Sequence, residues 1–199
     1  MNLPLRLIAV FGLAGLAATV HAEGDATAGK VKFETCRGCH AVPSYANAFP
    51  NYHVPMIGGQ HGARVVAALK AYRAGERKHP TMIAQAASLS DQDIDDIAAY
   101  VSSTKTSSDA KPVGEAPAKV AVCAACHGQD GVSPSPEFPV LAGQHRDYLE
   151  RALNDYRSGW RSNPIMAPQA AALTPEEIKA VTAWFAAQSG PLHTMPMHE

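Results

Sequence analysis

Apolar residues along the chain recur at helical spacing, and the strict alternation that marks strands is scarce. Between His61 and Ala74, for example, Val65, Leu69 and Tyr72 fall on one helical face, and Gly75 follows as a stop signal. Further helices are expected at 25–35, from Ser90 onward, at 118–125, at 145–158 and after Thr174. We therefore predict an all-α protein.

The chain contains a copy of itself. Residues 59–101 align with residues 143–185 at a constant offset of 84 and without a gap, with 17 identities in 43 positions. The shared strings include G-Q-H, Y-R-x-G-x-R and P-x-M. Such a repeat indicates tandem duplication of one helical unit. The predicted organisation is a domain at 23–102, a Ser- and Pro-rich linker at 103–117, a second domain at 118–190 and a flexible tail at 191–199.

Residues 1–22 are set apart by their composition. One cation, Arg6, precedes the apolar run from Leu7 to Val20, and Val20-His21-Ala22 resembles a cleavage site. This order predicts a cleavable secretory signal peptide, and hence export to the periplasm. A retained membrane anchor is the alternative, although the apolar run is short for a span of about 20 residues.

Each repeat unit carries one C-x-x-C-H motif: C-R-G-C-H begins at Cys36 and C-A-A-C-H begins at Cys123. Two cysteines at this spacing, followed directly by a histidine, are typical of covalent haem c attachment. Each thiol adds across one porphyrin vinyl group, and the histidine is then held beneath the iron. We therefore predict two covalently bound haems c. The thioether bonds would come from four cysteines: Cys36, Cys39, Cys123 and Cys126. The proximal iron ligands would be His40 and His127.

Other uses of the C-x-x-C spacing fit less well. A thioredoxin-like pair needs one motif beside a βαβ pattern, and it leaves the duplication and the two histidines unexplained. A zinc site needs four thiolates around one metal, yet the two motifs begin 87 positions apart. The charge of the chain limits the class of partner. A net charge of −1 and the absence of a Lys/Arg run disfavour nucleic acid.

A six-coordinate haem iron needs a second axial ligand from elsewhere in its unit. Equivalent positions should serve both units, and Met82 aligns with Met166. Each methionine follows a proline by two positions, and we expect it in an irregular loop between two helices. We therefore predict His/Met coordination. His61 and His145 also pair, so bis-histidine coordination is the alternative, whereas three other candidates have no counterpart: His53, Met56 and His79.

Supporting roles are assigned to further paired residues. The carbonyls of Pro55 and Pro139 are predicted to accept the second ring N–H of the proximal histidines. Guanidinium and carboxylate groups form bidentate pairs, so four arginines are candidate partners of the haem propionates: Arg73, Arg77, Arg157 and Arg161. The tail contains two histidines and two methionines, for which copper binding is a less favoured alternative to disorder: His193, Met195, Met197 and His198.

Longer strings in the second unit resemble a known family. C-A-A-C-H-G-Q-D-G, F-P-V-L-A-G-Q-H, Y-R-S-G-W-R-S-N-P-I-M-A-P and A-A-L-T-P-E-E-I look like the dihaem cytochrome c-four family, and the likeness covers nearly all of the chain after residue 22. The first unit departs after its haem motif, where C-H-A-V-P-S-Y-A-N-A-F-P-N-Y-H replaces the family's C-H-G-x-D-G turn. The resemblance implies two tandem class I cytochrome c domains, the cysteine and histidine roles given above, and Met82 and Met166 as distal ligands. It also implies electron transfer from a quinol-oxidising complex toward a terminal oxidase.

Coordination chemistry favours the same function. Two axial ligands on each iron leave no position for oxygen or peroxide, and His/Met coordination raises the reduction potential. We predict a dihaem carrier of single electrons, not an enzyme, whose partners are redox proteins rather than small molecules or nucleic acid. Peripheral association with the membrane is left open. Two alternatives are an electron-accepting subunit of a periplasmic dehydrogenase and a dihaem peroxidase-like enzyme, which needs one displaceable ligand.

Overall fold

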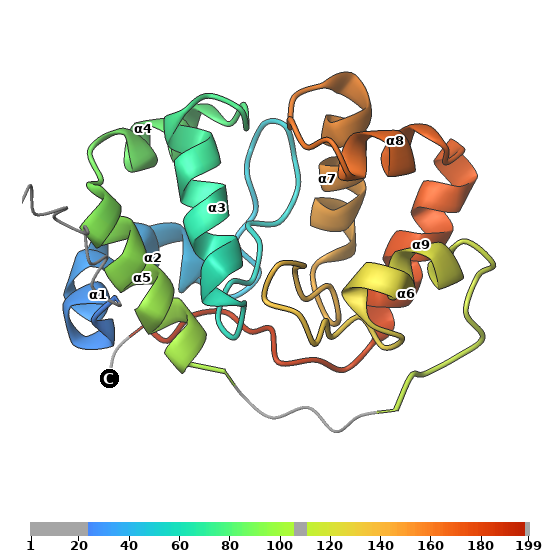
Figure 1. Cartoon of the computed structure of the whole chain (residues 1–199), viewed down its shortest axis with the longest axis horizontal. Helices are drawn as coiled ribbons and strands as arrows, with labels where there is room; N and C mark the ends of the chain where they lie inside the picture. The colour runs from blue at the N-terminus through green and yellow to red at the C-terminus, as the bar shows by residue number, and fades with distance from the viewer. Residues whose placement is uncertain (1–23, 106–110, 198–199) are drawn as a thin grey trace, which may run out of the picture.

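The computed structural model describes residues 24–105 and 111–197, and within these ranges it has nine helices and only isolated β-bridges. The helices form two lobes that lie side by side (Figure 1). The predicted all-α class is confirmed. The predicted signal peptide lies outside the described residues. None of the helices in the described ranges is long and apolar enough to cross a membrane.

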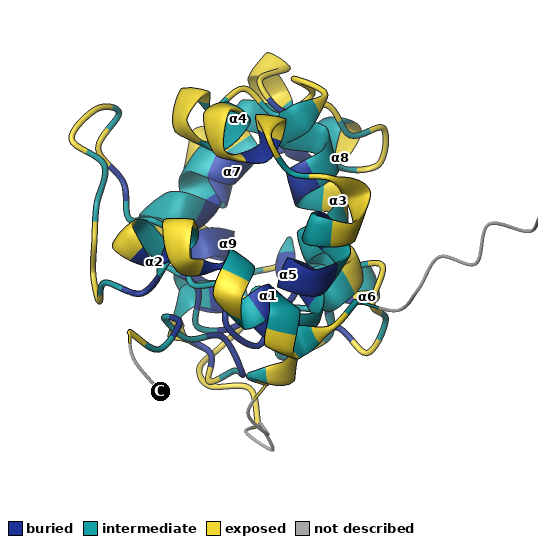
Figure 2. Cartoon of the chain, turned by 90° about the vertical axis from the view of Figure 1, so that its left-hand side faces the viewer, coloured by how far each residue is buried: buried dark blue, intermediate teal, exposed yellow. Residues whose placement is uncertain are grey.

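The first domain is built from five helices: α1 (Ala26–Lys32), α2 (Glu34–His40), α3 (Gly62–Arg73), α4 (Pro80–Ala87) and α5 (Asp91–Ser103). Helix α1 packs against α5, and α3 packs against both α4 and α5. Their apolar faces meet in one core, in which Phe33, Ile94 and Val101 are at most 1% exposed. Figure 2 shows the buried faces of these helices turned toward the interior.

A glycine and a buried carboxylate fix the contact between α1 and α5. A Cβ atom on Gly29 would collide with the carbonyl oxygen of Asp96, so glycine is required for the close approach. The Asp96 side chain accepts hydrogen bonds from the Lys32 ammonium group and from the backbone N–H of Asp25, the latter at 2.8 Å. These donors, Lys32 above all, lower the pKa of Asp96, so the buried carboxylate stays charged.

The second domain repeats the plan with four helices: α6 (Val120–His127), α7 (Arg146–Ser158), α8 (Met166–Ala171) and α9 (Pro175–Ala187). Helix α7 packs against α8 and α9 around a core that includes Leu149, Ile178 and Phe185. The segment before α6 is not helical. It attaches to this domain through Val113, whose backbone exchanges hydrogen bonds of 2.7 and 3.0 Å with the side-chain amide of Gln188.

Local sequence explains where the helices begin and end. Ser90 and Thr174 each form a capping box with the acidic residue three positions later, and both helices begin where they were predicted. Pro175 occupies the first position of α9, where its missing N–H costs no hydrogen bond. Gly159 ends α7 with a φ of 76°, a conformation that glycine adopts without strain.

The structure corrects the prediction of a flexible tail for residues 191–197. The chain leaves α9, runs back along the lower edge of the molecule and ends against the first domain (Figure 1). Leu192 and Met195 are buried, and Gly58 and His193 exchange backbone hydrogen bonds of 3.0 and 3.1 Å. The sequence failed here because the partners of this segment lie in the other domain, where no local pattern reveals them.

Candidate haem sites and the surface between the domains

The two C-x-x-C-H motifs occupy equivalent helices. Cys36, Cys39 and His40 lie at the end of α2, and the second motif ends α6 with His127 as its last residue. Residues three apart share one face of a helix, so the two thiols of each motif lie on the same side. None of the four cysteines is used in a disulfide. This is the arrangement that two thioether bonds to one porphyrin require.

Each predicted proximal histidine is held by a proline carbonyl. The Nδ1 atom of His40 lies 3.0 Å from the Pro55 oxygen, and that of His127 lies 2.9 Å from the Pro139 oxygen, as predicted. A carbonyl only accepts hydrogen bonds, so Nδ1 carries the proton and Nε2 is the nitrogen available to an iron. Burial lowers the pKa of both histidines, which favours the neutral imidazole that binds metals.

The thiols lack the features of a redox or zinc site. Burial raises the pKa of the Cys36 and Cys123 thiols, whereas reactive redox cysteines have a lowered pKa. The two motifs also lie in different domains, which separates the four sulfur atoms that a zinc site would need to gather. Among the described residues, no three His, Cys, Asp or Glu side chains group as metal ligands.

The paired methionines lie at the starts of equivalent helices. Met82 is in the first turn of α4 and Met166 is the first residue of α8. The expected irregular loop is therefore wrong, because Pro80 opens a helix, as proline readily does at the first helical position. The side chains at the paired positions His79 and Asn163 accept hydrogen bonds from the methionine N–H groups, at 3.3 and 2.8 Å. Both methionines thus have the same backbone anchor.

Two arginine side chains contain a buried N–H group that has no acceptor in the described part of the chain, and an acidic group of a haem could bind it. The Nε–H of Arg64, in α3, is buried and has no hydrogen-bond partner among the described residues, and the Nε–H of Arg77 is in the same position. The charge of Arg64 contributes to the lowered pKa of His127, so Arg64 lies near the second motif although it belongs to the first domain. A haem propionate would supply the missing acceptors, so the residues present fit the group. Sequence reasoning missed Arg64 because its paired position holds Tyr148.

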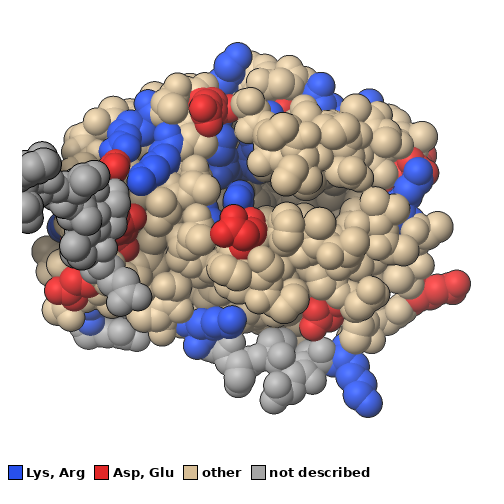
Figure 3. All heavy atoms as spheres, in the orientation of Figure 1, with Lys and Arg blue, Asp and Glu red and all other residues tan. Residues whose placement is uncertain are grey.

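Two of the four arginines predicted to bind propionates meet at the domain boundary. Arg77 and Arg161 pair through a β-bridge, and both donate to the hydroxyl of Tyr148, at 3.5 and 3.1 Å. Burial of the phenol opposes its ionisation, but the two cations outweigh this effect and lower the pKa of Tyr148 to about 8. Arg73 instead pairs with an acid of its own domain, and Arg157 is exposed. Figure 3 shows Lys and Arg side chains in the hollow between the lobes.

The glutamines of the two G-Q-H strings join the domains by reciprocal hydrogen bonds. The Gln144 amide donates to the Met56 carbonyl at 2.8 Å and accepts from the Met56 N–H at 3.0 Å. Gln60 makes the same pair of bonds with Val140, at 3.1 and 3.0 Å. Met56 and Val140 are themselves equivalent in the repeat. This symmetry explains the duplicated glutamine, which the sequence showed but could not assign.

The two histidines of the same strings also contact the opposite domain. His61 Nε2 lies 3.0 Å from the Ser133 carbonyl, and the ring of His145 stacks on His53 with centroids 4.7 Å apart. His53 also binds the Asp147 carboxylate through Nδ1 at 2.7 Å. Because His61 and His145 are engaged in these contacts, bis-histidine coordination of the irons is disfavoured. They also give a role to the segment around His53, where the first unit departs from the family's turn.

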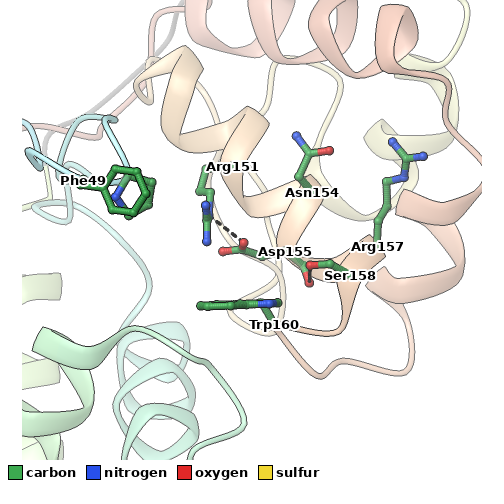
Figure 4. A pocket seen from close by; sticks show the side chains of 8 residues that line it. Phe49, Arg151, Asn154, Asp155, Arg157, Ser158 and Trp160 are labelled. Carbon is green, nitrogen blue, oxygen red and sulfur yellow. Dashed lines mark hydrogen bonds and ion pairs between the residues drawn. The ribbon is translucent and has the colours of Figure 1, made fainter.

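An open groove of about 630 Å³ lies beside this boundary. The Phe49 side chain, 94% exposed, stands on the first-domain side, across from Arg151 and Trp160 (Figure 4). Arg151 pairs with Asp155 at 2.7 Å and lies over the Trp160 ring. Arg157, a predicted partner of the haem propionates, lines the groove, but none of the lining residues is a predicted thioether or iron ligand. The groove is therefore a surface feature separate from the candidate haem sites.

Replacing Gln144 with alanine is expected to weaken the domain contact. The substitution leaves the N–H and carbonyl groups of Met56 without partners, at a cost of about 1–3 kcal/mol for each buried group. We expect a lower midpoint of thermal unfolding and larger interdomain distances by small-angle X-ray scattering. Gln169→Ala, at an exposed position on α8, is the matched control. Equal behaviour of the two variants would contradict the role assigned to Gln144.

Comparisons with known proteins match both halves of the chain to cytochromes c. Two segments match the cytochrome c family, at residues 26–105 and 114–188. The sequence is 35% identical to cytochrome c4 of Pseudomonas aeruginosa, over 92% of this chain and 96% of the relative. It is 30% identical to a thiosulfate dehydrogenase electron acceptor of Stutzerimonas stutzeri, over 84% of this chain and 83% of the relative. The crystal structure of reduced recombinant cytochrome c4 from Pseudomonas stutzeri matches with a TM-score of 0.65 at 33% identity, covering 85% of this chain and 100% of that chain.

Proposed function

The chain belongs to the dihaem cytochrome c4 family, and we propose that it carries single electrons between redox proteins of the periplasm, with one histidine and one methionine on each haem iron. Its two cytochrome c domains each hold one covalent haem c. In our assignment the thioether bonds come from Cys36 and Cys39, and from Cys123 and Cys126. The axial ligands are His40 with Met82 in the first domain and, in the second, His127 with Met166.

The duplicated support of the ligands carries this proposal. In both domains a proline carbonyl holds Nδ1 of the histidine, and a side-chain acceptor holds the backbone N–H of the methionine. A dihaem enzyme needs one haem iron with a displaceable ligand. If the two haems had different roles, we would expect different hydrogen bonds to hold their ligands. Equal support of both sites favours two closed centres with one shared task.

Each haem supplies an iron that exchanges one electron at a time. The residues of the chain keep the site closed and rigid around it. The bond from Nδ1 to the proline carbonyl fixes the orientation of the imidazole, and it makes the ligand nitrogen more electron-rich. A thioether ligand favours the ferrous state and raises the reduction potential. Because both ligands stay in place, no substrate position opens when the oxidation state changes.

Ligand-binding and electron-counting experiments test the proposal on the holoprotein. The reduced chain should pass two electrons to a one-electron oxidant such as ferricyanide, and it should not bind carbon monoxide. The oxidised chain should not turn over hydrogen peroxide. Rapid peroxide turnover, or carbon monoxide binding at one haem, would reveal a displaceable ligand and would support the peroxidase-like alternative.

A second candidate is an electron-accepting subunit of a dehydrogenase. It is favoured by the 30% identity to a thiosulfate dehydrogenase electron acceptor, which extends over most of both chains. This function uses the same haem chemistry and differs in the donor protein. Purification from the native organism separates the two candidates. A stable complex with a catalytic subunit that reduces the haems when thiosulfate is added would support the second, whereas a free monomeric protein supports the first.

A further inference from the structure

A short segment of the second domain completes the core of the first. We call residues 191–197 the strap; it follows α9 and crosses to the first domain (Figure 1). Near its start, Leu192 packs with Val140 of the second domain. Near its end, Met195 is 1% exposed and belongs to the same buried cluster as Phe33 of the first domain. The strap is therefore part of both domains.

The strap contacts both of the backbone segments that hold the first proximal histidine. The N–H of Met195 donates to the carbonyl oxygen of His40 at 3.0 Å. The backbone of His193 pairs with Gly58, three residues after the Pro55 carbonyl that binds the His40 ring. A Cβ atom on Gly58 would collide with the imidazole of His193, which shows how closely the strap lies. These contacts close the protein behind the proximal side of the first haem.

The strap also holds a cation within the first haem motif. Arg37, between the two cysteines, is 8% exposed, and its Nη1 atom donates to the carbonyl of Pro196 at 2.5 Å. The guanidinium group lies over the rings of Phe33 and Tyr100. Its Nε–H pairs with Glu34, whose side chain is 63% exposed and therefore well solvated. The strap therefore helps to keep the Arg37 guanidinium group inside the protein, while the carboxylate that pairs with it lies at the surface.

The second haem motif has no equivalent of this arrangement. The position between its cysteines that corresponds to Arg37 is Ala124, which has neither a charge nor a hydrogen-bond donor in its side chain. The two sites share a proline carbonyl on the histidine and a side-chain acceptor on the methionine N–H, but each has its own cation, Arg37 at the first motif and Arg64 near the second. Contact of a cation with the strap is thus a feature of the first site.

We propose that the strap raises the reduction potential of the first haem. A ferric haem carries one more positive charge than a ferrous haem. The apolar packing of Met195 beside the His40 backbone and the retained charge of Arg37 both disfavour that extra charge. Neither Met195 nor Arg37 is an iron ligand. Met195 holds the strap in place, and Arg37 acts on the haem through its charge. The proposal goes beyond electron carriage and rests only on attachment of a haem to the first motif.

Potentiometric titration of the holoprotein tests the proposal, with the two haems followed separately by their NMR methyl resonances. A chain that ends at Gly190 and the variant Met195→Asp are expected to lower the potential of the first haem and to leave that of the second unchanged. Met195→Leu should restore the wild-type value, because it keeps the apolar filling. Met197→Leu, an uncharged change at a strap position that is 44% exposed, is the control and should have no effect.

Several results would overturn the proposal. An unchanged first-haem potential in the truncated chain would remove the role of the strap, and equal shifts of both haems would indicate a general loosening of the protein. Should the truncated chain and Met195→Asp fail to retain the first haem, Arg37→Ala decides, because it leaves the strap in the core. A lowered first-haem potential in that variant supports the proposal, whereas an unchanged value contradicts it.

Discussion

Replacement of Met166 by leucine is expected to convert the second haem iron from low spin to high spin. Leucine has a similar volume, so the fold is retained at a cost of less than about 1.5 kcal/mol, but it has no sulfur to bind the iron. Loss of the thioether should lower the reduction potential by an amount on the order of 0.1 V, within the range of about 0.8 V that axial ligands span. Electron paramagnetic resonance and potentiometry measure the two effects. Met82→Leu should do the same to the first haem.

Met197→Leu is the control for these variants, because Met197 lies at the surface and is 44% exposed. It should leave both spin states and both potentials unchanged. A Met166→Leu protein that remains fully low spin would show that another residue binds the iron. In that case His145 would be the first candidate to examine, although its ring is stacked against His53 in the structure.

Removal of one haem is expected to unfold the domain that holds it. In the double variant Cys123→Ala/Cys126→Ala, the second domain would keep only the small core formed by α6, α7 and α9. An apolar core in a unit of this size rarely contributes more than about 3–5 kcal/mol, and haem supplies much of the buried apolar surface. We expect loss of about half of the helical circular dichroism signal, while the spectrum of the first haem is retained.

The single variant Cys123→Ala is the control for the double variant. It keeps Cys126, so one thioether bond still holds the haem, and the domain should remain folded. A cooperative, native-like melt of the second domain in the double variant would contradict the expected dependence on haem. Such a result would mean that the apolar helix faces are sufficient to specify the fold.

Local patterns were enough to predict the helices and the groups beside each histidine. The T-P-E-E string specified the start of α9, because a capping box needs only residues within one turn. The pairing of Pro55 with Pro139 likewise pointed to the two carbonyls that bind the proximal histidines. In each case the repeat acted as an internal comparison, since a residue needed by both units stands at both positions.

Long-range contacts were not accessible in the same way. Met195 was assigned to a flexible tail because its neighbours in sequence form no apolar period, yet its partners are Phe33 and the end of α2, far away in the chain. Gln60 and Gln144 were visible as duplicated residues, but their role depends on how the two domains face each other. The position of the methionines was misjudged because proline can open a helix as well as interrupt one.

The optical spectrum of the oxidised holoprotein, with haem content determined on the same sample, distinguishes two closed haem sites from one open site. We expect two haems c per chain and two low-spin ferric irons, both with the absorption band of a methionine–ferric bond. One high-spin iron, or one haem without the methionine band, would contradict two closed His/Met centres. A chain without covalently bound haem would contradict the entire assignment.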